Sequence, residues 1–404
     1  MNSKQIYRSD NTVYPILFII GACHLLNDSL QAVIPAMFPI LENSLGLTFT
    51  QLGLIAFTLN MVASVMQPVI GMYTDKRPMP FALPIGLTSS MLGMLGLAFA
   101  PNFWMILISV IFIGLGSATF HPEGSRVAYL AAGNRRGLSQ SIFQVGGNTG
   151  QSLAPLITAL ILVPLGQFGA IWFTLVAGIA VLLLIYIAKW YQNQFIPTSK
   201  EVSIVKEDKK QLIISKRTLW TTIIMLVFVV FARSWYQSAI SNFYAFYAIE
   251  QFEISIAKAQ IYIFSFLFMG AVGTFLGGPF ADRFGKRNVI IISFLMPIPL
   301  AIGLPFANAV ISIVLLLLIG LFIMSSFSVT VVYAQELMPG KVGTMSGLIV
   351  GLAFGMGAIG SVAFGTLIDW IGLTPTMIIV SILPLIGVLS FLLPSDESIA
   401  KWYA

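Results

Sequence analysis

Charged residues are scarce in this sequence. Asp, Glu, Lys and Arg make up 9% of its 404 residues, against about a quarter in an ordinary soluble domain. So few charges cannot cover a surface that faces water, and 57% of the residues are hydrophobic. The mean hydropathy of +0.92 also indicates a strongly apolar chain. Most of the surface must therefore face lipid, and a soluble protein is excluded.

Cysteine and histidine are almost absent. The single cysteine, Cys23, excludes an intrachain disulfide, and we interpret it as a small packing residue in an apolar stretch. The two histidines, His24 and His121, have no cysteine partners, so the pattern predicts no metal site. We also expect no cofactor.

Patterns typical of enzymes are missing as well. There is no G-x-x-x-x-G-K-[ST] run, which argues against ATP hydrolysis. No Ser-His-Asp or phosphate-binding cluster is visible, so we expect a protein that is not an enzyme. A membrane receptor is the alternative from another class, and it would bind a partner without moving a solute. The net charge of +6 does not indicate nucleic-acid binding, because the basic residues lie between the apolar stretches.

Long apolar stretches recur along the whole chain. Each has about 20 residues or more, enough to cross a hydrocarbon core of roughly 30 Å as a helix, whereas a membrane β-barrel would show short alternating segments. The first stretch is too long for a signal-peptide core, so we expect it to be retained. The sequence predicts an all-α membrane protein with twelve spans at residues 13–40, 49–73, 81–100, 103–131, 137–164, 167–191, 218–248, 256–281, 287–306, 308–336, 342–368 and 373–394.

The basic residues orient these spans. With span ends included, 18 of the 21 lysines and arginines fall on the side that holds both termini, and the opposite side has only Lys258. The remaining two, Arg126 and Arg233, lie inside spans. Basic loops stay in the cytoplasm, so we expect both termini to be cytoplasmic in a bacterial inner membrane.

The chain reads as two similar halves joined by a polar linker. We predict a six-helix bundle at 1–191, a cytoplasmic linker at 192–217 and a second six-helix bundle at 218–404. Asp75 and Asp282 are 207 positions apart, and Gly137 and Gly343, which each open a Gly-rich span, are 206 apart. Such a nearly constant offset indicates internal duplication, and parallel six-span repeats are typical of one large class of transporters.

The loop motifs carry a family resemblance. Residues 278–287 fit the pattern G-x-x-x-D-R-x-G-[KR]-[KR], which resembles the loop signature of the major facilitator superfamily; the copy at 71–77 keeps only part of it. Stretches around His24–Asp28, Gln67–Pro68, 120–128 and 140–148 are similar to the fosmidomycin resistance branch of that superfamily. The resemblance implies two pseudo-symmetric bundles, a central cavity lined by spans 1, 4, 7 and 10, and export of an anionic phosphonate by proton exchange.

Two buried charges occupy equivalent depths in the two halves. These are Asp28 in span 1 and Arg233 in span 7. Burying a charged side chain in a bilayer costs at least about 2.5 kcal/mol, so each of these charges indicates a function. We expect Asp28 to bind a proton and solute, with His24 on the same helix face, and Arg233 to bind solute beside Tyr236. The alternative is a structural ion pair between the halves.

Spans 4 and 5 add further polar groups. Glu123 and Arg126 are three residues apart and can pair; we expect Glu123 to carry a proton, and Arg126 to bind solute or else to reach the membrane surface. His121 is either a solute ligand or an ordinary core histidine. In span 5, Gln144 and Asn148 belong to a polar stripe that also includes Gln140 and is followed by Gln151, and we expect Gln144 and Asn148 to bind solute. Gly146 and Gly150 predict close helix packing.

The resemblance also assigns a cytoplasmic gate. Carboxylates at span ends can cap a neighbouring helix. Arg283 and Arg287 can pair with acids, and Glu336 is a candidate partner. The alternative is that these charges only set topology. The expected gate residues are Asp75, Lys76, Asp282, Arg283, Arg287 and Glu336.

The sequence thus predicts a monomeric secondary transporter driven by protons. Its expected cargo is a small anionic drug such as fosmidomycin, exported by antiport. The alternative is a symporter that takes up an organic anion or a sugar with protons.

Overall fold

The computed structural model describes residues 5–6, 11–133, 136–196, 214–338 and 342–402. Within them, twelve helical segments are long and apolar enough to cross a membrane, which confirms the predicted count. The chain separates into two compact units, Met1–Gly46 with Thr58–Val205 (unit 1) and Leu47–Phe57 with Lys206–Ala404 (unit 2). Most of the predicted linker at 192–217 lies outside the described residues, so the predicted domain boundary stays a prediction.

Unit 1 consists of helices and one short strand pair, in which β1 and β2 are antiparallel. It also holds the part of α3 from Thr58 onward. Its elements are β1 (Gln5–Ile6), α1 (Tyr14–Ala36), α2 (Phe38–Leu45), α3 (Phe49–Lys76), α4 (Ala82–Phe99), α5 (Phe103–Ala131), α6 (Arg136–Ile157), a π-helix η1 (Thr158–Leu162), α7 (Val163–Leu165), a 3-10 helix η2 (Gln167–Ala170), α8 (Ile171–Gln192) and β2 (Phe195–Ile196).

The first span is shorter than predicted. The sequence indicates apolar helix through residue 40, but α1 ends at Ala36 and α2 begins at Phe38. Pro39 has no backbone N–H and so cannot bond to the carbonyl four residues earlier, which interrupts the helix. Gly46 then closes α2 with a φ of 62°, a left-handed conformation that suits glycine.

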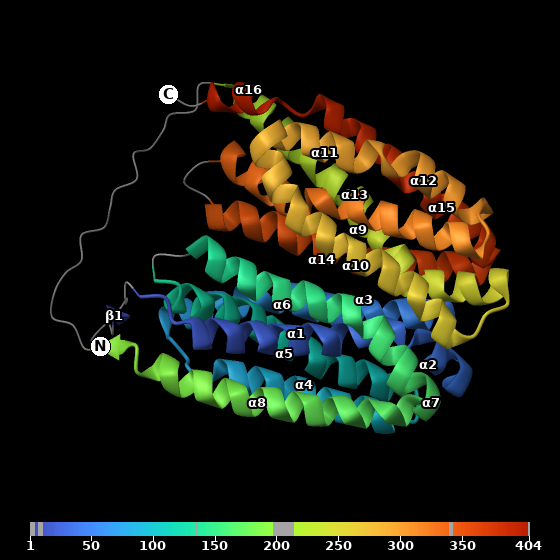
Figure 1. The fold of residues 1–404 in the computed structure, drawn as a ribbon, viewed down its shortest axis with the longest axis horizontal. Helices are drawn as coiled ribbons and strands as arrows, with labels where there is room; N and C mark the ends of the chain where they lie inside the picture. Colours follow the sequence, from blue (N-terminus) through green and yellow to red (C-terminus); the bar gives the residue numbers. More distant parts are fainter. Residues whose placement is uncertain (1–4, 7–10, 134–135, 197–213, 339–341, 403–404) are drawn as a thin grey trace. The chain divides into compact units, whose positions relative to one another are not determined.

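Glycine sets the packing of unit 1. Helix α1 lies along α6, and α4 packs on α5 and α8 (Figure 1). A Cβ atom at Gly146 would collide with the backbone carbonyl of Gly21, and one at Gly150 with that of Leu25. The predicted close packing of this glycine pair is therefore confirmed, and its partner is α1. Such close approach stabilises helix pairs in lipid, where no hydrophobic force drives them together.

Unit 2 is again helical and holds the first part of α3. In it, α10 packs on α13, and α9 packs on α14. The elements are α9 (Lys216–Phe252), α10 (Ile256–Phe284), α11 (Lys286–Leu295), α12 (Pro297–Gly303), a 3-10 helix η3 (Leu304–Phe306), α13 (Ala309–Leu337), α14 (Val342–Ile371), α15 (Leu373–Ile382), a 3-10 helix η4 (Leu383–Leu392) and α16 (Asp396–Ala400).

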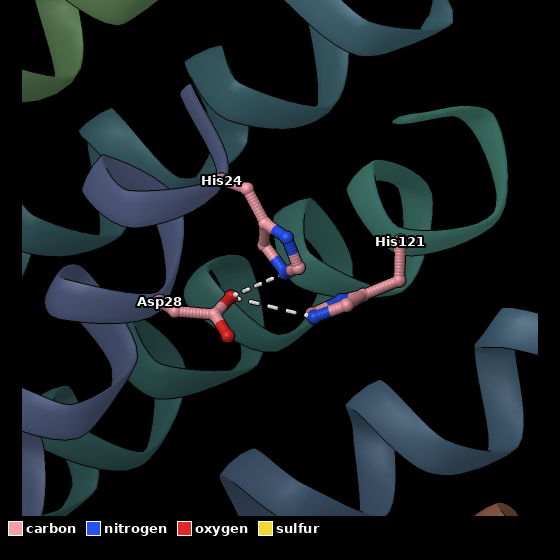
Figure 2. A group of neighbouring side chains, drawn as sticks. All are labelled: His24, Asp28 and His121. Carbon is pink, nitrogen blue, oxygen red and sulfur yellow. Dashed lines mark ion pairs between the residues drawn. The ribbon is translucent and has the colours of Figure 1, made fainter. Parts of the chain in front are cut away.

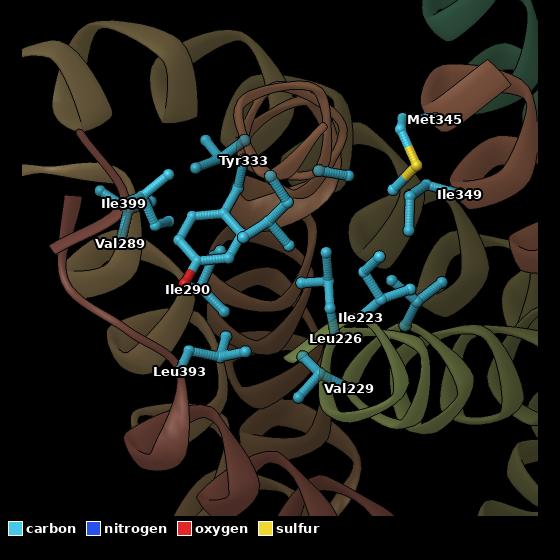
Figure 3. Packing of buried hydrophobic residues seen from close by; sticks show 14 of the residues in the cluster. Ile223, Leu226, Val229, Val289, Ile290, Tyr333, Met345, Ile349, Leu393 and Ile399 are labelled. Carbon is cyan, nitrogen blue, oxygen red and sulfur yellow. The ribbon is translucent and has the colours of Figure 1, made fainter. Parts of the chain in front are cut away.

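A hydrophobic cluster holds one end of unit 2 together. Figure 3 shows Tyr333 of α13 close to Ile290 of α11 and Ile399 of α16, with Leu226 of α9 in the same cluster. The Tyr333 hydroxyl donates a hydrogen bond to the carbonyl of Pro394, 2.7 Å away. The cluster therefore fixes the C-terminal segment to the helix bundle.

The start of α3 is bound within unit 2 by Asp369 of α14. Its carboxylate accepts hydrogen bonds from the backbone N–H groups of Phe49, at 3.0 Å, and Thr50, at 2.7 Å. The Thr50 hydroxyl donates to the same side chain. A carboxylate at a helix N-terminus satisfies free N–H groups and meets the positive end of the helix dipole.

Candidate transport site

Three predicted residues of unit 1 meet in one cluster. Asp28 Oδ1 lies 3.4 Å from His24 Nε2 and 3.3 Å from His121 Nε2. Figure 2 shows both imidazoles pointing at the carboxylate, one from α1 and one from α5. The prediction that His24 and Asp28 share a helix face is confirmed, and the two side chains are in contact. That His121 joins them could not be read from the sequence, because the contact crosses between helices.

Backbone carbonyls fix the orientation of both imidazoles. His24 Nδ1 lies 2.7 Å from the carbonyl oxygen of Phe143, and His121 Nδ1 lies 2.9 Å from that of Ser117. A carbonyl oxygen can only accept, so each Nδ1 carries a proton. In a neutral imidazole the Nε2 atom is then an acceptor, and here it faces the carboxylate, another acceptor. The cluster therefore requires a cation at these atoms, either protons or a metal ion.

Amide side chains surround Asp28. Gln151 of α6 donates to Asp28 Oδ2 at 2.9 Å, Asn27 donates to Oδ1 at 3.0 Å, and Gln31 lies 3.5 Å from Oδ1. None of these three is among the site residues predicted from the sequence. The spacing of Gln31, three residues after Asp28 on one helix, was a signal for it, whereas Gln151 reaches Asp28 from another helix.

Gly147 makes room for the cluster. A Cβ atom there would lie 2.6 Å from His24 Nε2 and 2.8 Å from Asp28 Oδ2. The His24 ring also stacks on Phe143, with 4.0 Å between ring centroids. Any side chain at position 147 would therefore displace the groups that face each other.

Glu123 and Arg126 form the predicted ion pair on α5, with 3.2 Å between Oε1 and Nε. Arg126 also donates to the backbone carbonyl of Thr74 at 3.1 Å and contacts its hydroxyl at 3.3 Å. Glu123 is fully buried. The charge of Arg126 thus has a partner inside unit 1, and its predicted role in solute binding stays a prediction.

Two further predicted solute ligands lie on α6. Gln144 is exposed and lies with its Nε2 atom 3.4 Å from Asn148 Oδ1, as neighbours one helical turn apart do. Asn148 is half-buried. Their assignment to solute binding also stays a prediction.

Arg233 is a buried cation in unit 2. Its Nη1 atom lies 3.3 Å from the hydroxyl of Thr330 and 3.5 Å from that of Ser326, and its guanidinium lies over the Phe327 ring at 4.9 Å. Nη2 is buried without a hydrogen-bond partner, and no carboxylate among the described residues lies within ion-pair distance. A buried positive charge without a matching anion is costly, so this site favours an anion.

Tyr236 lies one helical turn after Arg233 on α9. Its side chain is buried, and its hydroxyl has no hydrogen-bond partner within the described residues. It lines a small cavity of unit 2 together with Tyr244, Tyr247 and Ser381. The sequence predicted Tyr236 as a solute ligand, and this placement leaves its hydroxyl available.

The predicted gate residues of unit 2 are arranged differently from expectation. Glu336 pairs with Lys286 at 3.1 Å, and within the described residues it pairs with neither predicted arginine. Arg287 instead donates to the backbone carbonyls of Leu393 and Phe391. A main-chain acceptor of this kind cannot be recognised in a sequence, because every residue has one.

A carboxylate that was not predicted from the sequence caps α11. Asp396 Oδ2 accepts a hydrogen bond from the backbone N–H of Lys286 at 2.7 Å, whereas Asp282 and Arg283 are exposed. Gly285 has a φ of 86°, and a Cβ there would lie 2.6 Å from Asp396 Oδ2, so the motif glycine serves both the turn and the cap. The side chains of Asp75 and Lys76 lie outside the described residues.

Comparison with known proteins decides the family. The Major Facilitator Superfamily sequence profile matches residues 17–359, most of the chain. The chain belongs to the major facilitator superfamily. A relative of this superfamily, the MFS-type transporter YfnC of Bacillus subtilis, is 66% identical over 404 residues, which covers all of this chain and 98% of the relative. The chain is therefore a multi-pass membrane transporter.

A second relative indicates the branch of the superfamily to which the chain is similar. The fosmidomycin resistance protein of Escherichia coli is 41% identical over 391 residues, covering 96% of this chain and 94% of the relative. The predicted resemblance to this branch is therefore confirmed.

Solved structures of the superfamily confirm the fold. A bacterial homologue of the human lysosomal transporter Spinster superposes with a TM-score of 0.79 at 15% identity, covering 97% of this chain and 98% of that one. The nucleoside transporter NupG superposes with a TM-score of 0.71 at 14% identity, covering 96% and 99%. At such low identity these likenesses show the fold alone.

Proposed function

We propose that this transporter exports a small anionic drug of the phosphonate class, such as fosmidomycin, in exchange for protons. The buried and unmatched charge of Arg233 carries the proposal, because it fits an anionic cargo. The relative whose name refers to fosmidomycin resistance, similar along nearly the whole chain, supports the choice of cargo. We further propose an inner-membrane location with both termini in the cytoplasm, as the basic loops predict.

The chemistry of a phosphonate suits Arg233. Its guanidinium is held by Thr330 and Ser326 through Nη1, which leaves Nη2 to donate to a ligand. A phosphonate offers several anionic oxygens, and charge-assisted hydrogen bonds to them are about twice as strong as neutral ones. The ring of Phe327 under the guanidinium keeps water from one face.

Two acids are predicted to carry the coupling proton, Asp28 and Glu123. Asp28 lies in a cluster that needs a cation, whereas Glu123 already has Arg126 as a partner. Of the two predicted acids, we therefore propose Asp28 as the first to test.

The test combines drug susceptibility with transport in vesicles. An export-deficient bacterial host expressing the chain should tolerate more fosmidomycin, and everted vesicles acidified inside should accumulate it. Arg233→Gln should lower uptake into these vesicles about 10- to 100-fold, the range of a lost hydrogen bond to a charged group. Arg217→Gln is the matched control, because Arg217 lies exposed on the same helix.

Three outcomes decide the proposal. Equal transport by the two arginine variants would remove Arg233 as the anion site. Accumulation only when the gradient is reversed would support the symporter alternative. No effect of the gradient at all would contradict proton coupling.

A further inference from the structure

We propose that His24, Asp28 and His121 form a binding site for one divalent transition-metal ion, of which Zn²⁺ and Cu²⁺ are probes. The three side chains offer two imidazole nitrogens and one carboxylate oxygen, all within 4.8 Å of one another. This site goes beyond the proposed function, and its test requires no transport. The expectation that two histidines make no metal site considered cysteine as the missing ligand; the third ligand here is Asp28.

The geometry is close to that of a metal site. Ligands bound at about 2.0–2.2 Å with angles near 90–110° lie roughly 3.0–3.5 Å apart. Asp28 Oδ1 already lies 3.4 Å from His24 Nε2 and 3.3 Å from His121 Nε2. The separation of the two nitrogens, at most 4.8 Å, needs to shorten by up to roughly 1.3–1.8 Å, which rotation of the two imidazoles can supply. Two histidines and one carboxylate are a ligand set of several transition metals.

The surroundings orient the ligands for an ion. Metal-binding histidines almost always donate their other ring N–H to a carbonyl or carboxylate, which aims the free nitrogen at the metal. His24 and His121 both do so, through Phe143 and Ser117. Gln151 holds the second carboxylate oxygen of Asp28 and leaves Oδ1 directed at the imidazoles. All three donor atoms are thus held toward one point.

The cluster is open to an ion on one side, and its three donor atoms favour a positive charge. The His121 side chain is 26% exposed, whereas that of Asp28 is 4% exposed, so the cluster has an accessible edge and a buried floor. With both Nδ1 atoms protonated, three lone pairs converge on one another. Their mutual repulsion is relieved by a divalent cation as well as by protons, and a single ion does so with coordinate bonds.

The decisive measurement exploits how few histidines and cysteines the chain has. Its two histidines are both in the cluster, and its one cysteine is Cys23. Protein purified with a histidine-free affinity tag and stripped with a chelator is titrated with Zn²⁺ by calorimetry. It is then loaded with Cu²⁺ for pulsed electron paramagnetic resonance, in which imidazole nitrogen has its own modulation. We expect one ion per chain and a signal from two imidazoles.

Asparagine is the right replacement for each histidine. Its amide can keep the hydrogen bond that Nδ1 makes, but it has nothing in place of Nε2. His24→Asn, His121→Asn and Asp28→Asn should each weaken Zn²⁺ binding at least about 10- to 100-fold, the cost known for losing even an outer-shell partner. Asp369→Asn, which removes an acid outside the cluster, should leave binding unchanged.

The results separate this proposal from the proposed function. Absence of Zn²⁺ binding to the wild-type protein, or a Cu²⁺ signal without imidazole nitrogen, overturns the metal site even where fosmidomycin export is intact. Equal binding by wild type and a His24→Asn/His121→Asn double variant does the same. If the wild-type protein binds the ion but does not export fosmidomycin, the proposed function alone is overturned.

Discussion

Replacing Gly147 by alanine should disrupt the His24–Asp28 contact directly. The added methyl group would lie 2.6 Å from His24 Nε2 and 2.8 Å from Asp28 Oδ2. Heavy atoms in contact normally lie about 3.5–4.0 Å apart, so relief requires a shift of roughly 1 Å. The helices cannot simply separate, because Gly146 and Gly150 are packed on α1 on either side of this position.

The size of the effect follows from these contacts. Overpacking of this kind costs about 1–3 kcal/mol of stability, and in a unit of this size each kcal/mol lowers the melting temperature by about 2–4 °C. A displacement of about 1 Å at a functional centre can lower a rate about 100-fold. We therefore expect Gly147→Ala to reduce gradient-driven transport far more than it reduces stability.

Cys23 provides the stability assay. It is the only cysteine and is fully buried in α1 next to His24, so a thiol-reactive fluorophore reports when α1 opens on heating. Gly178→Ala is the control, because its methyl group would meet only Met91 Sδ at 3.8 Å. If Gly147→Ala matched this control in both melting temperature and transport, the inferred crowding at the cluster would be refuted.

Three further variants test separate contacts. Asp396→Ala removes the cap of α11 and should cost about 0.5–2 kcal/mol, measured as a lower melting temperature of the purified protein, with Glu397→Ala as an exposed control. Asp369→Asn should lower thermal stability by about 0.3–1 kcal/mol, and high salt should shrink the difference from wild type. Asp28→Asn should abolish proton-driven transport in vesicles while Glu123→Gln keeps part of it; full activity of both variants would exclude both acids as proton carriers.

The spans could be predicted because each is a long apolar stretch, and the count follows from composition and loop charge. Their interruptions depend on individual residues that a hydropathy window averages out. Pro39 separates α1 from α2, and the predicted fifth span contains the π-helix at Thr158–Leu162 after Pro155. The last span turns into a 3-10 helix at Leu383–Leu392, where Pro384 again lacks an N–H.

For the site, sequence spacing predicted what lies on one helix. The pairs His24–Asp28 and Glu123–Arg126 are one turn apart and contact each other as expected. Contacts between helices depend on rotation and depth, which no spacing fixes. This is why the approach of His121 to Asp28, the hydroxyls beside Arg233 and the cap by Asp396 appear only in the structure.

The scarcity of histidine also makes the cluster visible to spectroscopy. A protein grown with ¹⁵N-labelled histidine contains two labelled imidazoles, and both belong to the cluster. Each single His→Asn variant assigns the remaining resonance without any other labelling. Because the carbonyls of Phe143 and Ser117 hold a proton on each Nδ1, the chemical shift of Nε2 alone reports whether that atom is bare, protonated or bound to an ion. The occupant of the cluster can thus be followed in a lipid membrane while the cargo is added.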